Sequence, residues 1–436
     1  MPLPVYSYET YKKHHPQLSL NDFREEREKV LEIINTVRQK GDTALIDYAL
    51  KFDRAKIERL RVSEEEISLA EQSVDPAVLE ALKAAGGNIR KVHQRQVQSD
   101  WWLSGDGTLS GQRFVPLGSV GAYIPGGTAA YPSSVLMTVI PARVAGVKNI
   151  YICTPPAADG SINSLTLAAA REAGVTAVYK VGGAQAVAAM AYGTESVPAV
   201  DKIVGPGNIY VTLAKKEVFG QVGIDMLAGP SEIVIVADQN SEADLIAADM
   251  LSQAEHDELS RSILITTSED LAHLVRESLK EQLLTLPRKE IAEKSLKEQG
   301  AVILISDLEQ AWPVVNEIAP EHLEIHLENA WSYLSRITSA GSIFLGSSTP
   351  EPLGDYWAGS NHVLPTASTA RYASALGVAD FVKRSYVLAY TDDALERSAP
   401  QVALLARSEG LEAHARSVLI RRRGNGTQDK GRKKDC

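Results

Sequence analysis

The sequence has little cysteine, no long apolar run and no apolar core behind its first charged residues, and each absence excludes a class of protein. Two cysteines in 436 residues, Cys153 and Cys436, cannot build a disulfide framework or a zinc site of several thiolates, and they fit a reducing compartment. No apolar run approaches the roughly 20 residues that cross a bilayer, and no secretory signal is recognisable. We therefore expect a cytoplasmic protein.

Positive charge is scarce outside the end of the chain. The formal net charge is −10, and because residues 421–436 hold seven Lys or Arg and two Asp, residues 1–420 alone carry −15. An acidic body lacks the basic face that nucleic acid requires. The basic end can touch RNA or a membrane surface, but a solvated terminus is the commoner case, and we interpret residues 423–436 as a flexible tail. We expect no nucleic acid and no membrane among the partners.

Length and patterning indicate a globular enzyme with more than one domain. The chain is 44% hydrophobic and 23% charged, and its 436 residues exceed the size at which one core stops growing. From about Val120, short β-branched runs alternate with Ala-rich helical runs, and a second set of this alternation begins near Ser231. Such alternation predicts parallel sheets with helices on both faces. The predicted fold class is α/β, with two tandem doubly wound, incomplete Rossmann-like parallel-sheet domains and small helical N- and C-terminal extensions.

The predicted domain boundaries follow this alternation. We expect helices through about the first 115 residues and again from Val378 onward, because these stretches have helix caps and helical periodicity. The predicted domains are an N-terminal extension (1–21), a discontinuous first α/β domain (22–119 with 231–377), a second α/β domain (120–230) and a C-terminal helical domain (378–422).

Glycine-bearing loops follow three of the expected strands, although the dinucleotide fingerprint G-x-G-x-x-G is missing. They are GAYIPGG (121–127), GGAQ (182–185) and GPGN (205–208). Ligands of open parallel sheets lie beyond the carboxyl ends of the strands, and the last two loops lead into helices whose first amides can receive a phosphate. A tight turn is the commoner reason for any one of these glycines. Three in one sheet indicate a nucleotide site.

Two further polar residues are candidates for a metal site. Gln253 and His256 are three residues apart near the end of an expected helix, so they lie on one face. Spacing alone makes this a weak indication, because most such histidines are satisfied polar residues and glutamine is an uncommon metal ligand. The motif His-Glu-x-x-His is absent, which excludes the commonest metalloprotease signature. Cys153 has no basic neighbour in sequence, and we interpret it as an inert buried thiol.

Glu321 and His322 follow Pro320, which ends the preceding helix. In an extended segment their side chains point to opposite sides, whereas in a turn both can reach one ligand. Two different proton carriers could then serve two proton transfers. A histidine at a helix end beside a charge, without a catalytic role, is the alternative.

Together these motifs resemble the histidinol dehydrogenase family, and the resemblance runs from about residue 20 to about residue 422. Its most specific stretch is residues 224–232, joined in family order by GGAQA, VGPGN, LSQAEHD, APEHLEI, LGDYWAGSNHVLP and GLEAHARSV. The resemblance implies a zinc-dependent four-electron oxidation of L-histidinol to L-histidine via L-histidinaldehyde, with two NAD, in the last steps of histidine biosynthesis. A related zinc and NAD dehydrogenase of another small alcohol, such as a sulfonated diol, is an alternative. A zinc-dependent hydrolase and a non-catalytic relative are weaker ones.

The resemblance also implies the ligands of the site, and it makes residues 120–230 the NAD-binding side. One zinc ion per subunit is expected on Gln253, His256, Asp355 and His414. NAD contacts are expected from Tyr123, Gln185 and Asn208. Substrate contacts are expected from Ser231, Gln253, His256, His322, Asp355, Glu409 and His414.

The resemblance assigns the chemistry to Glu321 and His322. His322 is expected to take the hydroxyl proton as hydride leaves for NAD, and Glu321 to activate the water that attacks the resulting aldehyde. His322 then serves again in the second oxidation. Family members are intertwined homodimers with shared active sites, so Glu409 and His414 are expected to complete the site of the partner.

Overall fold

The structure is a computed structural model that describes residues 3–15, 22–126 and 131–422. Gly127 and the basic tail 423–436 lie outside the described residues. The chain forms two compact units: unit 1 comprises Met1–Val97 and Pro116–Phe381, and unit 2 comprises Gln98–Val115 and Val382–Cys436. Among the described helices, none has the length and apolar character needed to cross a membrane.

The first parallel sheet of unit 1 has the strand order β6-β5-β4-β7-β8. The chain begins in the middle at β4, moves outward to β6, and then returns to the other side of β4 through β7 and β8. The connections after β4 and β7 therefore diverge, which makes their carboxyl ends a topological switch point. The strands are β4 (Ser119–Tyr123), β5 (Asn149–Thr154), β6 (Ala177–Lys180), β7 (Lys202–Val204) and β8 (Gly223–Ile224).

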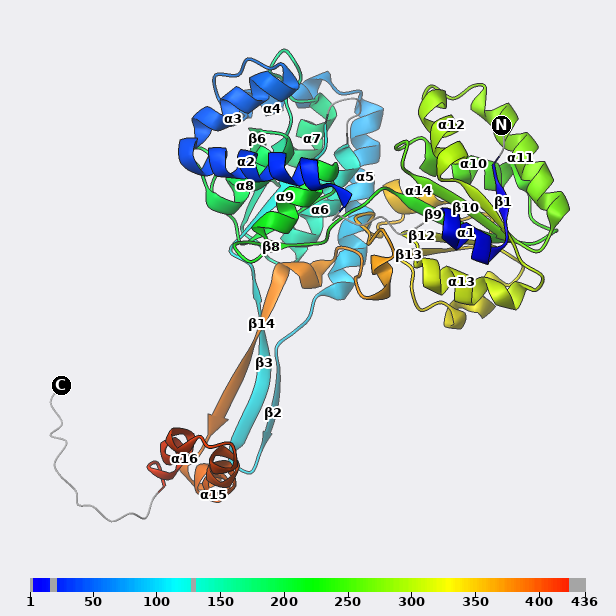
Figure 1. Cartoon of the computed structure of the whole chain (residues 1–436). Coiled ribbons are helices and arrows are strands. Elements are labelled where there is room, and N and C mark those ends of the chain that lie inside the picture. Colours follow the sequence, from blue (N-terminus) through cyan, green and yellow to red (C-terminus); the bar gives the residue numbers. More distant parts are fainter. Residues whose placement is uncertain (1–2, 16–21, 127–130, 423–436) are drawn as a thin grey trace, which may run out of the picture. The chain divides into compact units, whose positions relative to one another are not determined.

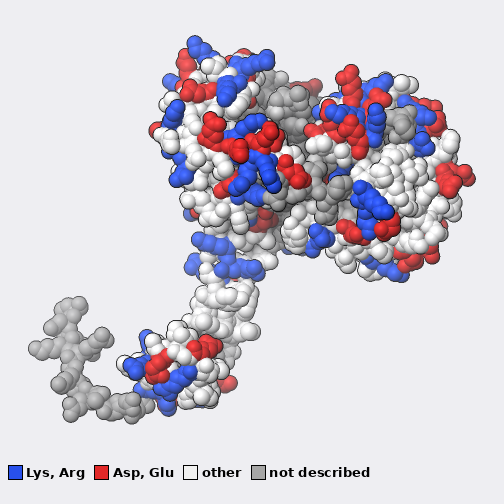
Figure 2. Space-filling model, viewed as in Figure 1, with Lys and Arg blue, Asp and Glu red and all other residues white. Residues whose placement is uncertain are grey.

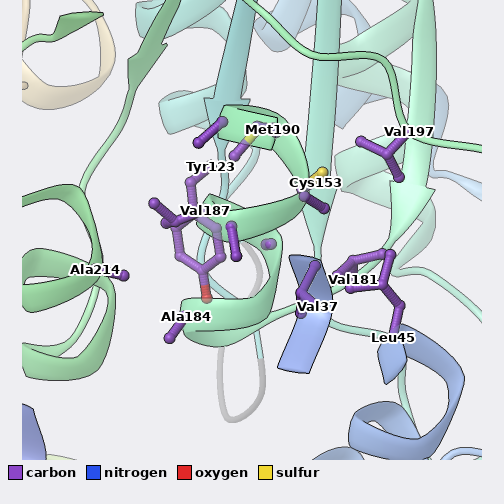
Figure 3. Packing of buried hydrophobic residues seen from close by; sticks show 14 of the residues in the cluster. Val37, Leu45, Tyr123, Cys153, Val181, Ala184, Val187, Met190, Val197 and Ala214 are labelled. Carbon is purple, nitrogen blue, oxygen red and sulfur yellow. The ribbon is translucent and has the colours of Figure 1, made fainter. Parts of the chain in front are cut away.

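Helices cover both faces of this sheet. One hydrophobic cluster joins it to α2, α3, α8 and α9, and a second joins it to α4, α5, α6 and α7. Figure 3 shows part of the first cluster, in which the Tyr123 ring packs near Val187 of α8. The helices are α2 (Arg24–Lys40), α3 (Asp42–Tyr48), α4 (Glu64–Ser73), α5 (Pro76–His93), α6 (Pro132–Val144), α7 (Ser164–Ala173), α8 (Gly183–Tyr192) and α9 (Ile209–Val218).

The second parallel sheet repeats this winding, with the order β1-β11-β10-β9-β12-β13. Helices α10, α11 and α12 pack on one face and α13 on the other (Figure 1). The strands are β1 (Val5–Tyr6), β9 (Glu232–Ala237), β10 (Arg261–Thr266), β11 (Ala301–Leu304), β12 (His322–His326) and β13 (Ser342–Leu345). The helices are α1 (Tyr8–His14), α10 (Ala243–Ala254), α11 (Glu269–Leu283), α12 (Lys289–Glu298), α13 (Ala311–Ile318) and α14 (Glu351–Tyr356). The predicted α/β class with two doubly wound parallel sheets is confirmed.

Unit 2 corrects two predictions of helix. Residues expected to be helical form the three-stranded sheet β14-β3-β2, which is followed by two helices. β2 and β3 pair as an antiparallel hairpin around Asp106 and Gly107, both with positive φ. Asp-Gly is a strong sequence signal for a two-residue hairpin, and it outweighs the helix predicted over these residues. The elements are β2 (Trp101–Gly105), β3 (Thr108–Pro116), β14 (Val382–Tyr390), α15 (Asp392–Ser408) and α16 (Glu412–Leu419). Both α/β sheets lie in unit 1, and the boundary predicted between two α/β domains stays a prediction.

Candidate active site

Three glycine-bearing loops meet at the switch point of the first sheet. Tyr123 ends β4, and Gly205 follows the adjacent β7. Gly205 has φ +108°, and a Cβ there would overlap the carbonyl oxygen of Tyr123, so only glycine allows this approach. The peptide N–H of Gly183, at the start of α8, donates to the Tyr123 hydroxyl at 3.1 Å. The three predicted loops therefore converge where an open sheet is expected to bind its ligand.

Helix starts hold the other two residues predicted to contact NAD. Gln185 is buried in the first turn of α8. Asn208 is the N-cap of α9, and its Oδ1 accepts the N–H groups of Tyr210 and Val211 at 3.1 and 3.2 Å. Both helices begin at this edge of the sheet, where the positive end of each helix dipole lies, and the N–H groups of Gly183, Tyr210 and Val211 are hydrogen-bonded within the protein. Burial raises the pKa of Tyr123 to about 12, so its phenol stays neutral.

The backbone N–H and C=O of Glu232 hold Glu321 and His322 together in the second sheet. The N–H donates to Glu321 Oε2 at 2.9 Å, and the carbonyl oxygen accepts from His322 Nδ1 at 3.1 Å. The carboxylate and the ring approach to 3.7 Å. The turn that precedes β12 contains Ala319 at φ +50°. Both side chains reach the backbone of Glu232, so they converge there, and their access to one ligand stays a prediction.

Burial sets the protonation of this pair. Loss of solvent raises the pKa of Glu321 well above its usual value, against the effect of the Glu232 N–H. Burial away from solvent lowers the pKa of His322 to about 3, although the hydrogen bond to the Glu232 carbonyl by itself raises it. The ring is therefore neutral near pH 7. Because Nδ1 donates to a carbonyl, its proton is on Nδ1 and the lone pair is on Nε2, which has no hydrogen-bond partner among the described residues.

Helices α10 and α14 bring the predicted metal ligands of unit 1 to the same region. Ser252, the neighbour of Gln253, donates to Glu351 Oε2 at 3.3 Å, and Glu351 lies one turn before Asp355. The charges of His256 and His362 both lower the pKa of His322, as expected of nearby rings. Gln253 Oε1 is buried with no hydrogen-bond partner in the described part of the chain. An unsatisfied amide oxygen, a carboxylate and a neutral imidazole fit a zinc ion.

A second set of possible ligands overlaps the predicted one. His322, Glu351 and Asp355 place one ligand atom each within 4.8 Å of one another. The His322 Nε2 and Glu351 Oε1 atoms are 3.8 Å apart. Burial and the neighbouring Asp355 raise the pKa of Glu351 to about 9, so this carboxyl keeps a proton at neutral pH. Zinc can thus be held either with His322 and Glu351 or with Gln253 and His256, Asp355 being common to both sets.

Sequence reasoning missed three contributors to the site. The sequence does contain a signal for Glu351, because it lies four residues before the predicted ligand Asp355 and therefore on the same helix face. His362, whose Nδ1 is 3.8 Å from Asp355 Oδ1, was not selected from its loop. Glu232 contributes through its backbone N–H and C=O, which a pattern of side chains does not reveal. Glu232 and His322 are the first residues of β9 and β12, so this candidate site differs from the glycine loops in lying at the amino ends of its strands.

The remaining predicted residues divide between the units. Ser231 directly precedes Glu232, the first residue of β9, whose backbone contacts Glu321 and His322. Glu409 and His414 are exposed in unit 2, at the end of α15 and in α16, so their role in this site stays a prediction. Cys153 is a buried free cysteine, and burial raises the pKa of its thiol, which agrees with an inert side chain.

Comparisons with known proteins agree with this geometry. The family model described as histidinol dehydrogenase matches residues 17–422. A histidinol dehydrogenase of Geobacillus kaustophilus is 54% identical over 398 residues, 91% of this chain and 94% of the relative. One of Listeria monocytogenes is 54% identical over 394 residues, 90% of this chain and 92% of the relative. The crystal structure of histidinol dehydrogenase from Elizabethkingia anophelis has a TM-score of 0.89 at 38% identity and covers 96% of each chain. The chain therefore belongs to the histidinol dehydrogenase family.

Proposed function

We propose that this protein oxidises L-histidinol to L-histidine through L-histidinaldehyde, with transfer of four electrons to two NAD, as the last steps of histidine biosynthesis. The observation that supports this most directly is the buried pair Glu321 and His322, held by the backbone N–H and C=O of one residue, Glu232. Two successive oxidations at one carbon need a base for the alcohol and a second group to activate water. This pair supplies two chemically different proton carriers within one pocket.

Zinc would be held by Gln253, His256 and Asp355 of one subunit and His414 of the partner. When bound, the ion holds the imidazole and amino nitrogens of the substrate. Ser231 and Glu409 would contact the substrate as well. The unpartnered Oε1 of Gln253 supports this set, because a buried amide oxygen without a hydrogen bond is costly unless a ligand satisfies it. NAD, which accepts the hydride, would lie against Tyr123, Gln185 and Asn208.

His322 would act as the base for both oxidations. Its Nε2 lone pair is free because the carbonyl of Glu232 fixes the Nδ1–H tautomer. The ring is neutral near pH 7, which is the form that can accept a proton. After the transfer, the positive ring would lie between two carboxyl groups, Glu321 and Glu351, which are 3.7 and 3.8 Å from its nitrogens. Either group can stabilise that charge when ionised.

Glu321 would activate the water that adds to the aldehyde. It is buried, so once it has lost its proton it is a stronger base than an exposed glutamate. The N–H of Glu232 orients Oε2 at 2.9 Å and leaves Oε1 to receive a proton from water. The hydrate formed in this way would lose its own hydroxyl proton to His322 in the second oxidation.

A homodimer would complete the site. Glu409 and His414 are on unit 2, which exposes many large apolar side chains in the single chain, and such surfaces usually mark an interface. Figure 2 shows mostly uncharged surface along the strands of this unit. The exposed apolar residues include Trp101, Trp102, Leu103, Tyr386, Leu388, Leu404, Leu405 and Ile420. Sedimentation analysis is expected to give a dimer, and a monomer with full activity would exclude a shared site.

The test of the proposed function is the number of NADH molecules formed per L-histidinol consumed, with and without a chelator. Two NADH per substrate, lost on chelation and restored by zinc, are expected. One NADH would restrict the protein to alcohol oxidation. If histidinol gives no NADH but another small alcohol is oxidised, the protein is a related zinc and NAD dehydrogenase of that alcohol. Hydrolysis without NADH would indicate a zinc hydrolase.

A further inference from the structure

The strand that begins with His322 has a second group of buried polar residues behind the site. In β12 every residue is buried, and the side chains alternate between the two faces of the sheet. Leu323 and Ile325 join the hydrophobic cluster that includes α13. His322, Glu324 and His326 therefore face the opposite side, where α10 packs. An apolar strand would be expected here, so the ionisable residues at 324 and 326 need an explanation.

His326 connects two carboxylates in this buried group. Its Nε2 is 3.2 Å from Glu324 Oε2 and 3.4 Å from Asp249 Oδ2 of α10. All three side chains are at most 10% exposed. Burial alone would lower the pKa of His326, but the hydrogen bonds to Asp249 and Glu324 raise it to about 9. Near neutral pH an imidazolium thus lies against Asp249 and Glu324, and burial raises the pKa of the Glu324 carboxyl to about 7.

The same group is linked to the elements that hold the active site. Glu324 Oε1 accepts the peptide N–H of Glu351 at 2.7 Å, at the first turn of α14. Asp355 follows Glu351 by one turn, and Gln253 follows Asp249 by one turn. His322 precedes Glu324 by two residues on the same face of β12. Asp249 is therefore one helical turn from Gln253, and Glu324 is one strand repeat from His322, both of them predicted site residues.

We propose that Asp249, Glu324 and His326 form a positioning triad that fixes α10, β12 and α14 relative to one another. Hydrophobic packing holds helices against a sheet but tolerates small rotations and slides, whereas charged hydrogen bonds have defined lengths and directions. The triad thereby orients Gln253 and Asp355 toward the metal and His322 toward the substrate. This inference rests on the proposed function, because it assigns the triad to that metal site.

The triad is not itself proposed as a metal site, although its residue types could ligate one. The Nε2–H of His326 faces both carboxylates, so the nitrogen that would coordinate an ion is the one that donates a hydrogen bond. A histidine must be neutral and deprotonated at the coordinating nitrogen to bind a metal. We therefore assign the position between the carboxylates to the imidazolium.

The test compares His326→Gln and Asp249→Asn with the wild type and with His273→Gln, a control at an exposed histidine of α11. Asp249→Asn keeps the shape of its side chain, so it serves if His326→Gln folds poorly. Zinc affinity of the folded dimer is measured by competition with a chelating indicator. Outer partners of metal ligands typically contribute about 10- to 100-fold in affinity. We expect a loss of that size and a lower kcat, with an unchanged KM for NAD.

A role limited to stability would lower the melting temperature but leave the zinc dissociation constant of the folded protein within twofold of the wild type. That result would overturn the proposal, as would two zinc ions per chain with one lost in Asp249→Asn. A failure of the proposed function gives a different result, because the wild type itself would then bind no zinc or form no NADH from histidinol.

Discussion

The Nδ1 atom of His322 lies 3.1 Å from the carbonyl oxygen of Glu232, in a position where it can only donate a hydrogen bond. This contact fixes one tautomer of the ring and leaves Nε2 free. Because the N–H of the same residue donates to Glu321, the backbone of Glu232 orients both side chains of the proposed catalytic pair. A side-chain replacement at Glu232 leaves these two bonds possible, whereas changes at positions 321 and 322 remove one function each.

Replacement of His322 by Gln is expected to slow both oxidations. A positioned general base supplies roughly 10²–10⁴-fold in rate, and both proton transfers are assigned to this ring. Single-turnover formation of NADH from histidinol and from histidinaldehyde checks this. Zinc content is the control. If His322→Gln lost its zinc, the ring would be a metal ligand with Glu351 and Asp355, and its assignment as the base would be wrong.

Replacement of Glu321 by Gln is expected to separate the two half-reactions. The amide oxygen of Gln can still accept the N–H of Glu232, so the shape of the pocket is retained while the base is removed. Aldehyde formation should stay near the wild-type rate, and oxidation of the aldehyde should fall about 10²-fold or more. The two rates are measured separately with histidinol and histidinaldehyde as substrates. Equal loss in both would contradict the role of Glu321 in water activation.

Much of the fold could be predicted because parallel α/β structure has a regular sequence pattern. The alternation of strands and helices from Val120 onward, and the glycines after β4, β6 and β7, follow from backbone constraints that are local in sequence. The helices predicted before residue 115 are confirmed as far as α5, which ends at His93, but beyond them Asp106-Gly107 allows a hairpin that pairs β2 with β3. Strand pairing depends on partners distant in sequence, and β14 is 266 or more residues from β3.

The site was predictable in part for the same reason. Glu321 and His322 are adjacent in sequence and follow a proline, so their candidacy could be argued locally. Glu351, His362 and the peptide of Glu232 reach the pair only through the fold, and no short pattern joins them. The amino-end location has a structural cause, because α10 runs back along the sheet and ends near the start of β12.

Two replacements distinguish the two possible metal sets. Asp355→Asn removes a ligand common to both, so zinc affinity should fall about 10-fold or more. Glu351→Gln should leave zinc affinity within a few-fold, because Glu351 is not among the proposed ligands and the amide of Gln can still hydrogen-bond Asp355 and Ser252. Metal analysis of both purified variants checks this. Equal zinc loss in the two would favour the set that contains Glu351.

The buried ion pair of Lys215 and Asp225 is expected to control NAD binding. Lys215 also donates to the carbonyl of Gly205 at 3.0 Å, and Asp225 Oδ2 accepts the N–H of Gly205 at 2.7 Å. The pair thus holds both polar groups of the residue that begins the Asn208 loop. A hydrogen bond to a charged group contributes roughly 1.5–3 kcal/mol. Since about 1.4 kcal/mol corresponds to tenfold, Lys215→Met should raise the KM for NAD about 10- to 100-fold.

The matched control for this prediction is Lys216→Met, on the next and less buried position of α9. Steady-state kinetics at saturating histidinol give the KM for NAD of both variants, and thermal unfolding reports any general loss of stability. An unchanged KM for NAD in a destabilised but folded Lys215→Met would mean that the pair stabilises the fold without positioning the loop.

The charge on His326 predicts how stability depends on pH. Against the effect of burial, the hydrogen bonds to Asp249 and Glu324 raise its pKa from the ordinary 6.5 to about 9 in the folded protein. Because the folded state binds this proton more tightly than the unfolded state, the stabilisation is complete below pH 6.5. This stabilisation disappears as the pH rises through about 9.

The difference in free energy of unfolding between the wild type and His326→Gln should therefore be largest near pH 6, on the order of 3 kcal/mol, and small near pH 10. Urea unfolding at a series of pH values measures it, with His273→Gln as the control. A difference that stayed constant or grew with pH would mean that the ring is neutral in the folded protein, and the triad would then be held by ordinary hydrogen bonds without an ion pair.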